Sequence, residues 1–276
     1  MPTPIGNLQD ITERARAVLS AVGVIAAEDT RQCRKLLGLL GVPAPTLIAV
    51  HEHNERDQAP ALLARLQAGE DIALVSDAGT PQVSDPGHVL LRTLWETPTE
   101  RRPRVVPLPG PSAASTLLSA CPIPLTDYVF AGFLPAKGKT RRAAIEALLA
   151  RPAATLLFES VHRITQLLDD IAALAPDRLL FIGRELTKLH ESLLYGTAPE
   201  CKHQLTARDA VRGEFALVVA GSGEERDVGA ATALLDVLLE ELPPAQAARL
   251  TARATGASKR ALYQQALARK PDQESE

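Results

Sequence analysis

Two apolar runs that resemble buried strands each end in a turn rich in glycine and proline. Residues 72–76 lead into Asp77-Ala78-Gly79-Thr80-Pro81, and residues 105–108 lead into a second turn, 109–113, that contains Ser112 and Ala113. Ligands of open α/β sheets bind beyond the carboxyl ends of the strands, where glycine lets them approach the backbone. The Asp77 carboxylate could accept hydrogen bonds from a ribose or oppose a positive charge. Ser112 could cap the next helix or offer a hydroxyl to a ligand.

One such loop would be interpreted as an ordinary strand-to-helix turn, but two in the same half of the chain favour a nucleotide-like ligand. The sequence contains neither the Gly-x-Gly-x-x-Gly fingerprint nor the Gly-x-x-x-x-Gly-Lys-Ser/Thr phosphate loop. It also lacks the Gly-x-Ser-x-Gly elbow of acyl-transfer enzymes. His51 and His53 stand two residues apart with no further Cys or His nearby, so we expect no metal site.

The first 120 residues alternate short apolar runs with helical patterns, which predicts a parallel sheet covered on both faces. We expect an N-terminal α/β domain over residues 1–121. Its predicted strands are 22–27, 46–50, 72–76 and 105–108, and its predicted helices are 8–20, 58–68, 88–96 and 112–120.

A proline-containing linker, 121–127, separates this domain from a second α/β domain over residues 122–225. Its predicted strands are 128–133, 155–158, 179–182 and 215–220, and its predicted helices are 140–149 and 162–174.

A small helical tail is expected over residues 229–270. Leucines at helical spacing precede Pro243-Pro244, which ends one helix and allows another to begin, and a third helix is expected over 259–267 after Gly256. Two short helices around a glycine-containing turn resemble a helix-turn-helix, although a helical hairpin docked on the core fits the pattern too.

Composition excludes several classes of protein. The three cysteines are scattered and no stretch approaches the ~20 apolar residues of a membrane span, so a secreted disulfide scaffold and a membrane protein are not expected. We expect a cytoplasmic protein. Although the net charge is −3, the sequence contains two basic clusters. Such clusters can contact phosphates, or they can simply form a solvated surface. They are Lys137, Lys139, Arg141 and Arg142, and, in the tail, Arg249, Arg253, Lys259, Arg260, Arg269 and Lys270.

Motifs along nearly the whole chain resemble those of one known group of proteins. They are residues 2–8, 26–31, 51–55, 73–81, 85–87, 105–112, 132–137, 158–163, 184–188, 213–214 and 259–267. In this order they resemble the tetrapyrrole-methylase-like superfamily and, within it, the ribosomal small subunit methyltransferase I family, which methylates a cytidine 2′-hydroxyl of 16S rRNA.

The resemblance implies two α/β domains of the tetrapyrrole-methylase type, with S-adenosylmethionine bound in the cleft between them. It implies a homodimer that acts on 16S rRNA or the small ribosomal subunit. By this likeness the cofactor would be contacted by Asp77, Ala78, Gly79, Thr80, Ser112, Ala113, Phe158 and Leu186.

One departure from the family pattern lies at the start of the chain. Members of the family usually carry an apolar strand directly before the motif at residues 2–8, whereas Met1 stands there in this sequence. A missing central strand would leave backbone groups of its neighbours unpaired, so we expect the true start to lie upstream.

Transfer of a methyl group to a ribose hydroxyl requires a group that accepts the hydroxyl proton. The candidates are Glu28, Asp29 and Glu159, each near the end of a predicted strand, and each could instead form an ion pair or a helix cap with a nearby arginine. We expect the acceptor cytidine to be turned out of its helix into the cleft. The candidate RNA-binding residues are Arg31, Lys137, Arg141, Arg142, Arg163 and Lys259.

Two other functions remain open at this point. A small-molecule methyltransferase acting on a tetrapyrrole would share the fold, although a basic tail has no evident use there. A non-enzymatic RNA-binding or ribosome-assembly protein would not need a turn such as 77–79 shaped for a cofactor.

Overall fold

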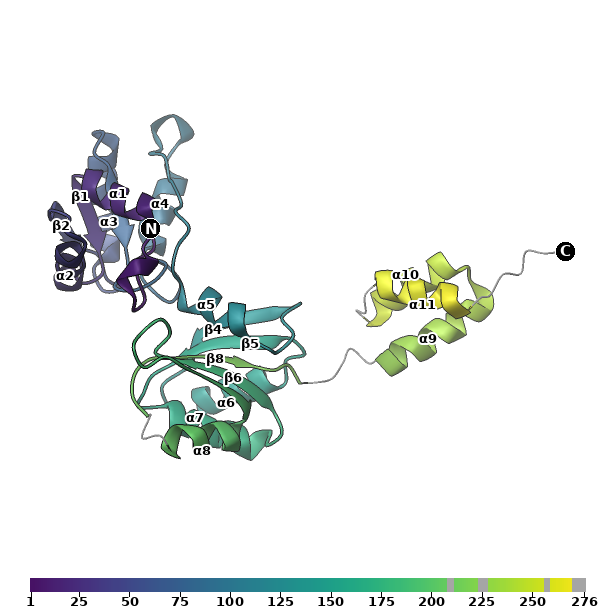
Figure 1. Ribbon diagram of the computed structural model, residues 1–276. Helices are drawn as coiled ribbons and strands as arrows, with labels where there is room; N and C mark the ends of the chain where they lie inside the picture. Colours follow the sequence, from purple (N-terminus) through teal and green to yellow (C-terminus); the bar gives the residue numbers. More distant parts are fainter. Residues whose placement is uncertain (208–210, 223–227, 256–258, 270–276) are drawn as a thin grey trace.

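The computed structural model describes residues 1–276 except 208–210, 223–227, 256–258 and 270–276, and the side chains of 228–230 and of Ala261 are likewise outside the description. Gly256 and Lys270, which the sequence singled out in the tail, therefore lie outside the described residues. The chain forms an N-terminal α/β unit, a second α/β unit and a group of three helices (Figure 1).

The N-terminal unit is built on a parallel sheet of three strands in the order β2-β1-β3. The strands are β1 (Val24–Ala27), β2 (Thr46–Ala49) and β3 (Ile72–Val75). Helices α1 (Glu13–Ala21) and α2 (Thr30–Leu40) bury Leu19 and Leu37 against one face. Helices α3 (Glu55–Gln67) and α4 (His88–Glu96) bury Leu62, Leu90 and Leu94 against the other. The expected parallel sheet with both faces covered is confirmed.

The strand expected over 105–108 is wrong, because these residues form no strand in the structure. Val105 and Val106 are 36% and 45% exposed. Prolines at 103, 107, 109 and 111 surround them, and proline has no backbone N–H to donate to a strand ladder. A short 3-10 helix, η2 (Thr99–Arg101), precedes this extended segment.

The helix expected over 8–20 is divided in two. A 3-10 helix, η1 (Leu8–Asp10), is followed by α1, whose first turn is capped by the Thr12 hydroxyl accepting from the Ala15 N–H at 3.0 Å. Helix α2 was not predicted at all. It begins after Asp29, whose carboxylate accepts from the Arg31 N–H, and ends at Gly41 with φ +66°.

The second unit is built on a mixed sheet of five strands in the order β4-β5-β8-β6-β7. Strands β4 and β5 are parallel, and the remaining neighbours are antiparallel. The bounds are β4 (Tyr128–Phe133), β5 (Ala154–Glu159), β6 (Leu179–Arg184), β7 (Ser192–Thr197) and β8 (Phe215–Val219).

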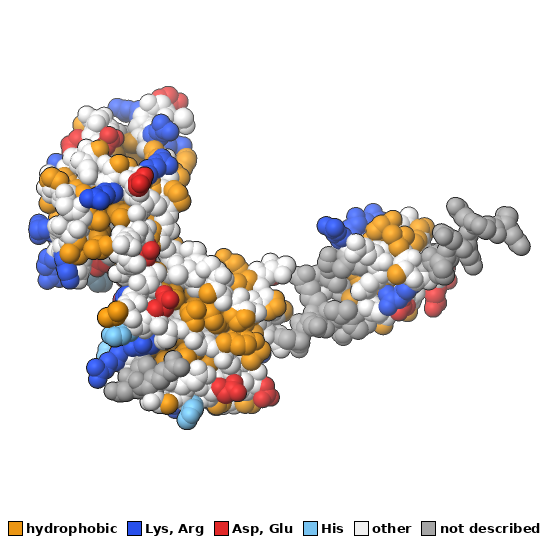
Figure 2. Space-filling model, in the orientation of Figure 1, with side chains coloured by type: hydrophobic (Ala, Val, Ile, Leu, Met, Phe, Trp, Pro, Cys, Tyr) orange, Lys and Arg blue, Asp and Glu red, His pale blue; other side chains and the backbone are white. Residues whose placement is uncertain are grey.

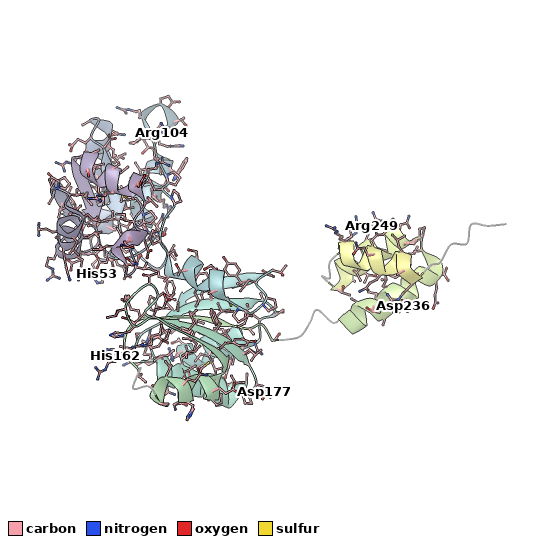
Figure 3. The ribbon with its side chains drawn as sticks, viewed as in Figure 1. His53, Arg104, His162, Asp177, Asp236 and Arg249 are labelled. Carbon is pink, nitrogen blue, oxygen red and sulfur yellow. The ribbon has the colours of Figure 1, made fainter. Side chains whose placement is uncertain are left out.

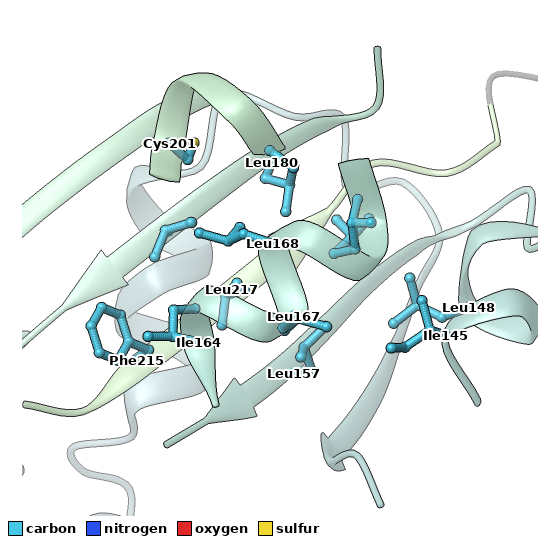
Figure 4. Packing of buried hydrophobic residues seen from close by; sticks show 14 of the residues in the cluster. Ile145, Leu148, Leu157, Ile164, Leu167, Leu168, Leu180, Cys201, Phe215 and Leu217 are labelled. Atoms are coloured by element: carbon cyan, nitrogen blue, oxygen red, sulfur yellow. The ribbon is translucent and has the colours of Figure 1, made fainter. Parts of the chain in front are cut away.

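Helices α6 (Gly138–Leu149), α7 (Ile164–Leu174) and α8 (Ala198–Ala207) cover one face of this sheet. Leu167 and Leu168 of α7 are fully buried there against Leu157 and Leu217 of the sheet (Figure 4). The opposite face receives α5 (Ala113–Ala120), whose Leu117 is fully buried in a second cluster. Strand β7 and helix α8 were not predicted from the sequence.

The tail consists of α9 (Val228–Glu241), α10 (Pro244–Thr255) and α11 (Lys259–Arg269). The three helices pack on one another around Leu235, Ala247, Ala248, Leu262 and Ala266. Pro243-Pro244 separates α9 from α10 as expected, with a proline at the first position of the new helix. Among the described residues, no helix combines the length and apolar character needed to cross a membrane.

Candidate active site

A pocket of about 360 Å³ lies where the two α/β units meet. From the N-terminal unit it is lined by Ile5 and by parts of the loop 78–85 that follows β3. The beginning of α5 adds Ser112 and Ala113. From the second unit it is lined by the ends of β4, β5 and β6 and by the beginning of β8. Neither unit alone would enclose the pocket.

Seven of the eight residues expected to contact the cofactor line this pocket. They are Ala78, Gly79, Thr80, Ser112, Ala113, Phe158 and Leu186. The eighth, Asp77, does not line it, and its exposed carboxylate instead accepts a hydrogen bond from the Asp29 N–H at 2.9 Å. That bond ties the loop after β3 to the loop after β1.

Gly79 is the residue on which the pocket loop turns. Its backbone exchanges hydrogen bonds of 2.9 and 3.0 Å with that of Thr3, and its φ is +81°, a conformation that favours glycine. A Cβ atom here would lie 3.2 Å from the Ile5 side chain. Thr80 then donates its hydroxyl to the Pro111 carbonyl at 2.9 Å, which joins the two turns singled out in the sequence.

Ser112 occupies the N-cap position of α5, but its side chain makes no capping hydrogen bond. Its hydroxyl is therefore not used to cap the helix, the first of the two roles considered for it. The amino end of α5 opens into the pocket through Ser112 and Ala113, where backbone N–H groups favour a negatively charged or hydrogen-bond-accepting ligand group.

Glu28 and Asp29, two of the three candidate proton acceptors, differ in their electrostatics. Burial raises the pKa of Glu28, the nearby Asp77 charge raises it further, and a hydrogen bond from the Asp77 backbone opposes both. Asp29 remains ionised at acidic pH, because its ion pair with Arg31 at 2.7 Å lowers its pKa to about 2. The Asp29 carboxylate also caps α2, so Asp29 makes both of the interactions considered as alternatives to catalysis.

Glu159, the third candidate, is fully buried inside the second unit. Its carboxylate forms ion pairs with Arg141 at 3.1 Å and with Arg163 at 2.7 Å, and it accepts the Ser160 N–H. Arg141 lies 3.7 Å from Asp170 as well, and only 7% of its side chain is exposed. Glu159 and Arg141 are thus partners in an internal ion pair. Both oxygens of Glu159 are occupied, and Arg141 is buried away from the surface although its Nη2 has no hydrogen-bond partner.

The other candidate RNA-binding residues are distributed unevenly. Arg31 and Arg142 have side chains that are 86% and 75% exposed, and each pairs with a neighbouring carboxylate. Lys137, which precedes α6, and Lys259, which opens α11, are exposed. Arg163 is 24% exposed and is held by Glu159 and the Leu134 carbonyl.

Asp85 is a pocket residue that sequence reasoning missed. It lines the pocket, and burial, followed by the nearby charge of Glu28, raises its pKa to about 6. In the sequence, the segment 85–87 stands out only as part of the family pattern. The available signal was a carboxylate soon after a strand, next to a proline and a glycine.

A second link between the units lies beside the pocket. The Asn7 N–H donates to the Thr187 hydroxyl at 3.1 Å, and a Cβ atom on Gly6 would lie 2.8 Å from that hydroxyl and 3.2 Å from the Leu186 carbonyl. Lys188, in the same loop, forms ion pairs with Glu185 at 2.9 Å and with Glu214 at 3.0 Å.

Comparison with known proteins identifies the family. The model of the tetrapyrrole (corrin/porphyrin) methylases matches residues 2–202, and the model of the RsmI C-terminal HTH domain matches residues 225–270. The chain belongs to the tetrapyrrole methylase family. Within it, the chain is 47% identical over 271 residues to "Ribosomal RNA small subunit methyltransferase I" of Escherichia coli O157:H7, covering 97% of this chain and 93% of that protein. The protein of the same name from Pseudomonas aeruginosa is 43% identical over 274 residues, covering 97% and 95%.

Solved structures show the same fold at low sequence identity. The methyltransferase CobJ superposes with a TM-score of 0.56 at 18% identity, covering 79% of this chain and 91% of that chain. A uroporphyrin-III C-methyltransferase from Thermus thermophilus, complexed with S-adenosyl homocysteine, gives 0.51 at 17% identity, covering 78% and 94%. The expected fold class, two α/β units of the tetrapyrrole-methylase type, is confirmed.

Proposed function

We propose that this protein methylates the 2′-hydroxyl of a cytidine ribose in 16S rRNA of the small ribosomal subunit, with S-adenosylmethionine as methyl donor. The observation that carries this proposal is the pocket shared by the two units. Seven residues that the family pattern assigns to the cofactor line it together, although they come from four separate segments of the chain. We propose the boundaries 1–121, 122–225 and 229–270 for the three domains.

The pocket residues suit a cofactor that combines a nucleoside, whose base has apolar faces, with a charged end. Ala78, Ala113 and Leu186 offer small or aliphatic surfaces, and Phe158 offers an aromatic face. The amino end of α5 offers backbone donors. Bound there, the cofactor supplies a sulfonium methyl group that is already a strong electrophile. The protein contributes mainly positioning, which is worth ~7–11 kcal/mol in well-aligned reactions.

The RNA would approach the open side of this pocket with its target nucleotide turned out, because a ribose inside a helix is poorly accessible. The exposed cations Arg31, Lys137 and Arg142 would bind flanking phosphates. In the tail, Arg249 of α10 lies on a different face from Asp236 of α9 (Figure 3), and Asp236 pairs with Arg269 of α11 at 3.1 Å. The exposed side chains of Arg249 and of Lys259, at the start of α11, support RNA binding by these two helices.

The decisive experiment maps 2′-O-methyl groups on 16S rRNA from cells with and without the gene. We expect one cytidine to lose its methyl group when the gene is deleted and to regain it when the gene is returned. An unchanged methylation map, together with cofactor binding in vitro, would favour a small-molecule acceptor. Failure to bind S-adenosylmethionine would favour a non-enzymatic RNA-binding protein.

A homodimer is proposed from an apolar face of the second sheet. The strand registers place Tyr128, Phe130, Leu179, Leu193 and Tyr195 on the face that α5 covers only in part. Each of these five side chains is between 38% and 49% exposed. Hydrophobic side chains gather over this unit (Figure 2), and a patch of this kind marks an interface more often than a solvated surface.

The mass in solution tests this dimer. Tyr195→Asp should yield a monomer by light scattering, whereas Leu39→Asp, at a 60% exposed leucine of α2 in the other unit, should leave the dimer intact.

Because the proposed substrate is ribosomal RNA, we place the protein in the cytoplasm.

A further inference from the structure

Asp85 lines the pocket but has no role in the cofactor and RNA contacts proposed above. It follows β3 by ten residues, and it lines the pocket together with its neighbours Val83 and Ser84. Its position differs from those of Glu28 and Asp29, which do not line the pocket. It also differs from that of Glu159, whose carboxylate is held in ion pairs.

The loop that carries Asp85 has an unusual backbone. Gln82 and Ser84 adopt φ values of +69° and +72°, which non-glycine residues seldom do unless the surrounding structure holds them. The Val83 N–H donates to the Thr80 carbonyl at 3.2 Å. The Ser84 hydroxyl lies against Gly132 of β4, within 3.0 Å of where a Cβ atom would be. The loop therefore reaches across the cleft and fixes Asp85 between the two units.

The surroundings of Asp85 are acidic on the side of the first unit. Ser76 lowers the pKa of Asp85, whereas the charges of Glu28 and Asp77 raise it. His51 is close enough to influence Glu28 in turn. Burial and the two carboxylates together raise the pKa of Asp85 to about 6.

On the side of the second unit, the acidic pocket residues are neutralised by cations of their own. Glu214 pairs with Lys188, and Glu159 pairs with Arg141 and Arg163. Among the described residues, no lysine, arginine or histidine forms a salt bridge with Asp85. Asp85 is thus a pocket carboxylate without a cationic partner, and it is free to receive a proton.

We propose that Asp85 is the catalytic base that accepts the proton of the substrate hydroxyl. This role rests on the proposed function. As the ribose oxygen forms its bond to the methyl carbon, the sulfur–methyl bond breaks and its electron pair stays on sulfur. The hydroxyl proton passes to an Asp85 carboxylate oxygen. The positive charge of the sulfonium and the negative charge of the carboxylate disappear in the same step.

Asp85→Asn tests the proposal, because asparagine keeps the size of the side chain but is far too weak a base. Methyl transfer to small subunits from cells lacking the gene should fall by roughly 10²–10⁴-fold in kcat, the usual contribution of a general base. The affinity for S-adenosylmethionine, measured by calorimetry, should stay within about twofold. Asp71→Asn, an exposed aspartate at the opposite end of β3, is the matched control and should retain full activity.

The pH profile separates a base from a merely structural residue. A base must be ionised, so kcat/KM of the wild-type chain should rise with pH and level off above about pH 6. Asp85→Asn should lose this rise, and Asp85→Glu should restore part of the rate and the rise with it.

Wild-type kcat in Asp85→Asn, or a low kcat with the pH dependence unchanged, would overturn the proposal. So would a defect confined to cofactor affinity. A wild-type chain that binds the cofactor but methylates no rRNA would overturn the proposed function first, and this role of Asp85 with it.

Discussion

At the scale of the residue, the carboxylates that line the pocket differ in their counter-charges. Glu159 is the last residue of β5, and two arginines occupy its carboxylate oxygens. Asp85 lies in a loop with no regular structure, yet it is the carboxylate that faces the pocket without a cation. The cations around each carboxylate, and not its distance from a strand end, therefore distinguish Asp85 from Glu159.

Glu159→Gln should strongly destabilise the second unit. Removing the carboxylate charge leaves the buried Arg141 with only the more distant Asp170, 3.7 Å away, as a counter-charge, and breaking a buried pair costs up to ~3–5 kcal/mol. Denaturant unfolding measures this loss. Glu146→Gln, which breaks an exposed pair with Arg142, should cost less than ~0.5 kcal/mol. Unchanged stability of Glu159→Gln with lost methyl transfer would instead restore Glu159 as a catalytic candidate.

Asp77→Ala should weaken cofactor binding while the fold persists. The substitution removes the carboxylate that holds the loop after β3 to the Asp29 N–H, and such charge-assisted bonds contribute ~1.5–3 kcal/mol. We expect the dissociation constant of S-adenosylmethionine to rise at least about tenfold by calorimetry, with an unchanged circular dichroism spectrum. Tight binding by this variant would show that the loop keeps its shape without Asp77.

Asp85 also makes stability depend on pH. Its folded-state pKa of about 6 lies above the ordinary value of 3.8, so the native state binds the proton more tightly than the unfolded chain does. Wild-type stability is thus lost as pH rises from about 4 to about 6. Asp85→Asn should melt at a higher temperature than the wild type above this window, and the gap should shrink below it. A gap independent of pH would contradict this linkage.

At the scale of elements, the sequence predicted most accurately the helices and strands that are flanked by proline or glycine. Helix α4 and strand β4 match their expected bounds, and the strand ends that build the pocket were found within a few residues. Residues 105–108 had the right side chains for a strand, but prolines deprive the segment of donors. Strand β7 was missed because Leu193 and Tyr195 point to an apolar face that stays exposed, so the usual alternation of polar and apolar residues is lost.

Helix α2 was not predicted either, for two reasons that concern its ends. Its capping residue, Asp29, was considered as a candidate base with a salt bridge or a cap as the alternative, and Gly38 lowers the helical propensity of its last turn. The pairing of Glu159 with Arg141 could not be predicted from the sequence either, because the two residues are 18 positions apart and meet only when β5 packs on α6. Arg163, four positions from Glu159, was the partner that spacing could suggest.

The link between residues 5–7 and the loop 186–188 can be broken with one methyl group. Gly6→Ala places a Cβ atom against the Lys188 side chain and 3.2 Å from the Leu186 carbonyl, so the two loops must separate. We expect lower affinity for S-adenosylmethionine with both units still folded, as measured by calorimetry and circular dichroism. Gly23→Ala is the control, because a Cβ atom there meets nothing within 4 Å. Equal affinities of the two variants would show that the link does not shape the pocket.

At the scale of the whole molecule, a chain with a net charge of −3 is proposed to bind a polyanion through local clusters. The tail is the clearest case. Its three helices share one small core, so removing α10 and α11 alone would expose the apolar side of α9. A truncation that ends before α9 removes the tail as a unit and is the cleaner deletion.

Reversing two tail charges should weaken RNA binding and flatten its dependence on salt. The double variant Arg249→Glu and Arg253→Glu changes exposed side chains of α10. If both contact phosphates, the slope of log affinity against log salt should fall by about 1.4–1.8, since each phosphate contact contributes ~0.7–0.9. The double variant Arg14→Glu and Arg56→Glu, on the exposed sides of α1 and α3, makes the same change in net charge and is the control. An unchanged slope would exclude α10 from the RNA interface.

The pocket has one wall on each of two separately built units, and this has a thermodynamic consequence. Only molecules whose units are juxtaposed can bind the cofactor, so the observed affinity is the intrinsic affinity multiplied by the fraction of molecules in that arrangement. By reciprocity, the cofactor must hold the units together as strongly as their juxtaposition promotes its binding. The small molecule therefore acts as a cross-link between the units. Product left in the pocket would keep the proposed RNA-binding surface assembled, and its departure would release the two halves.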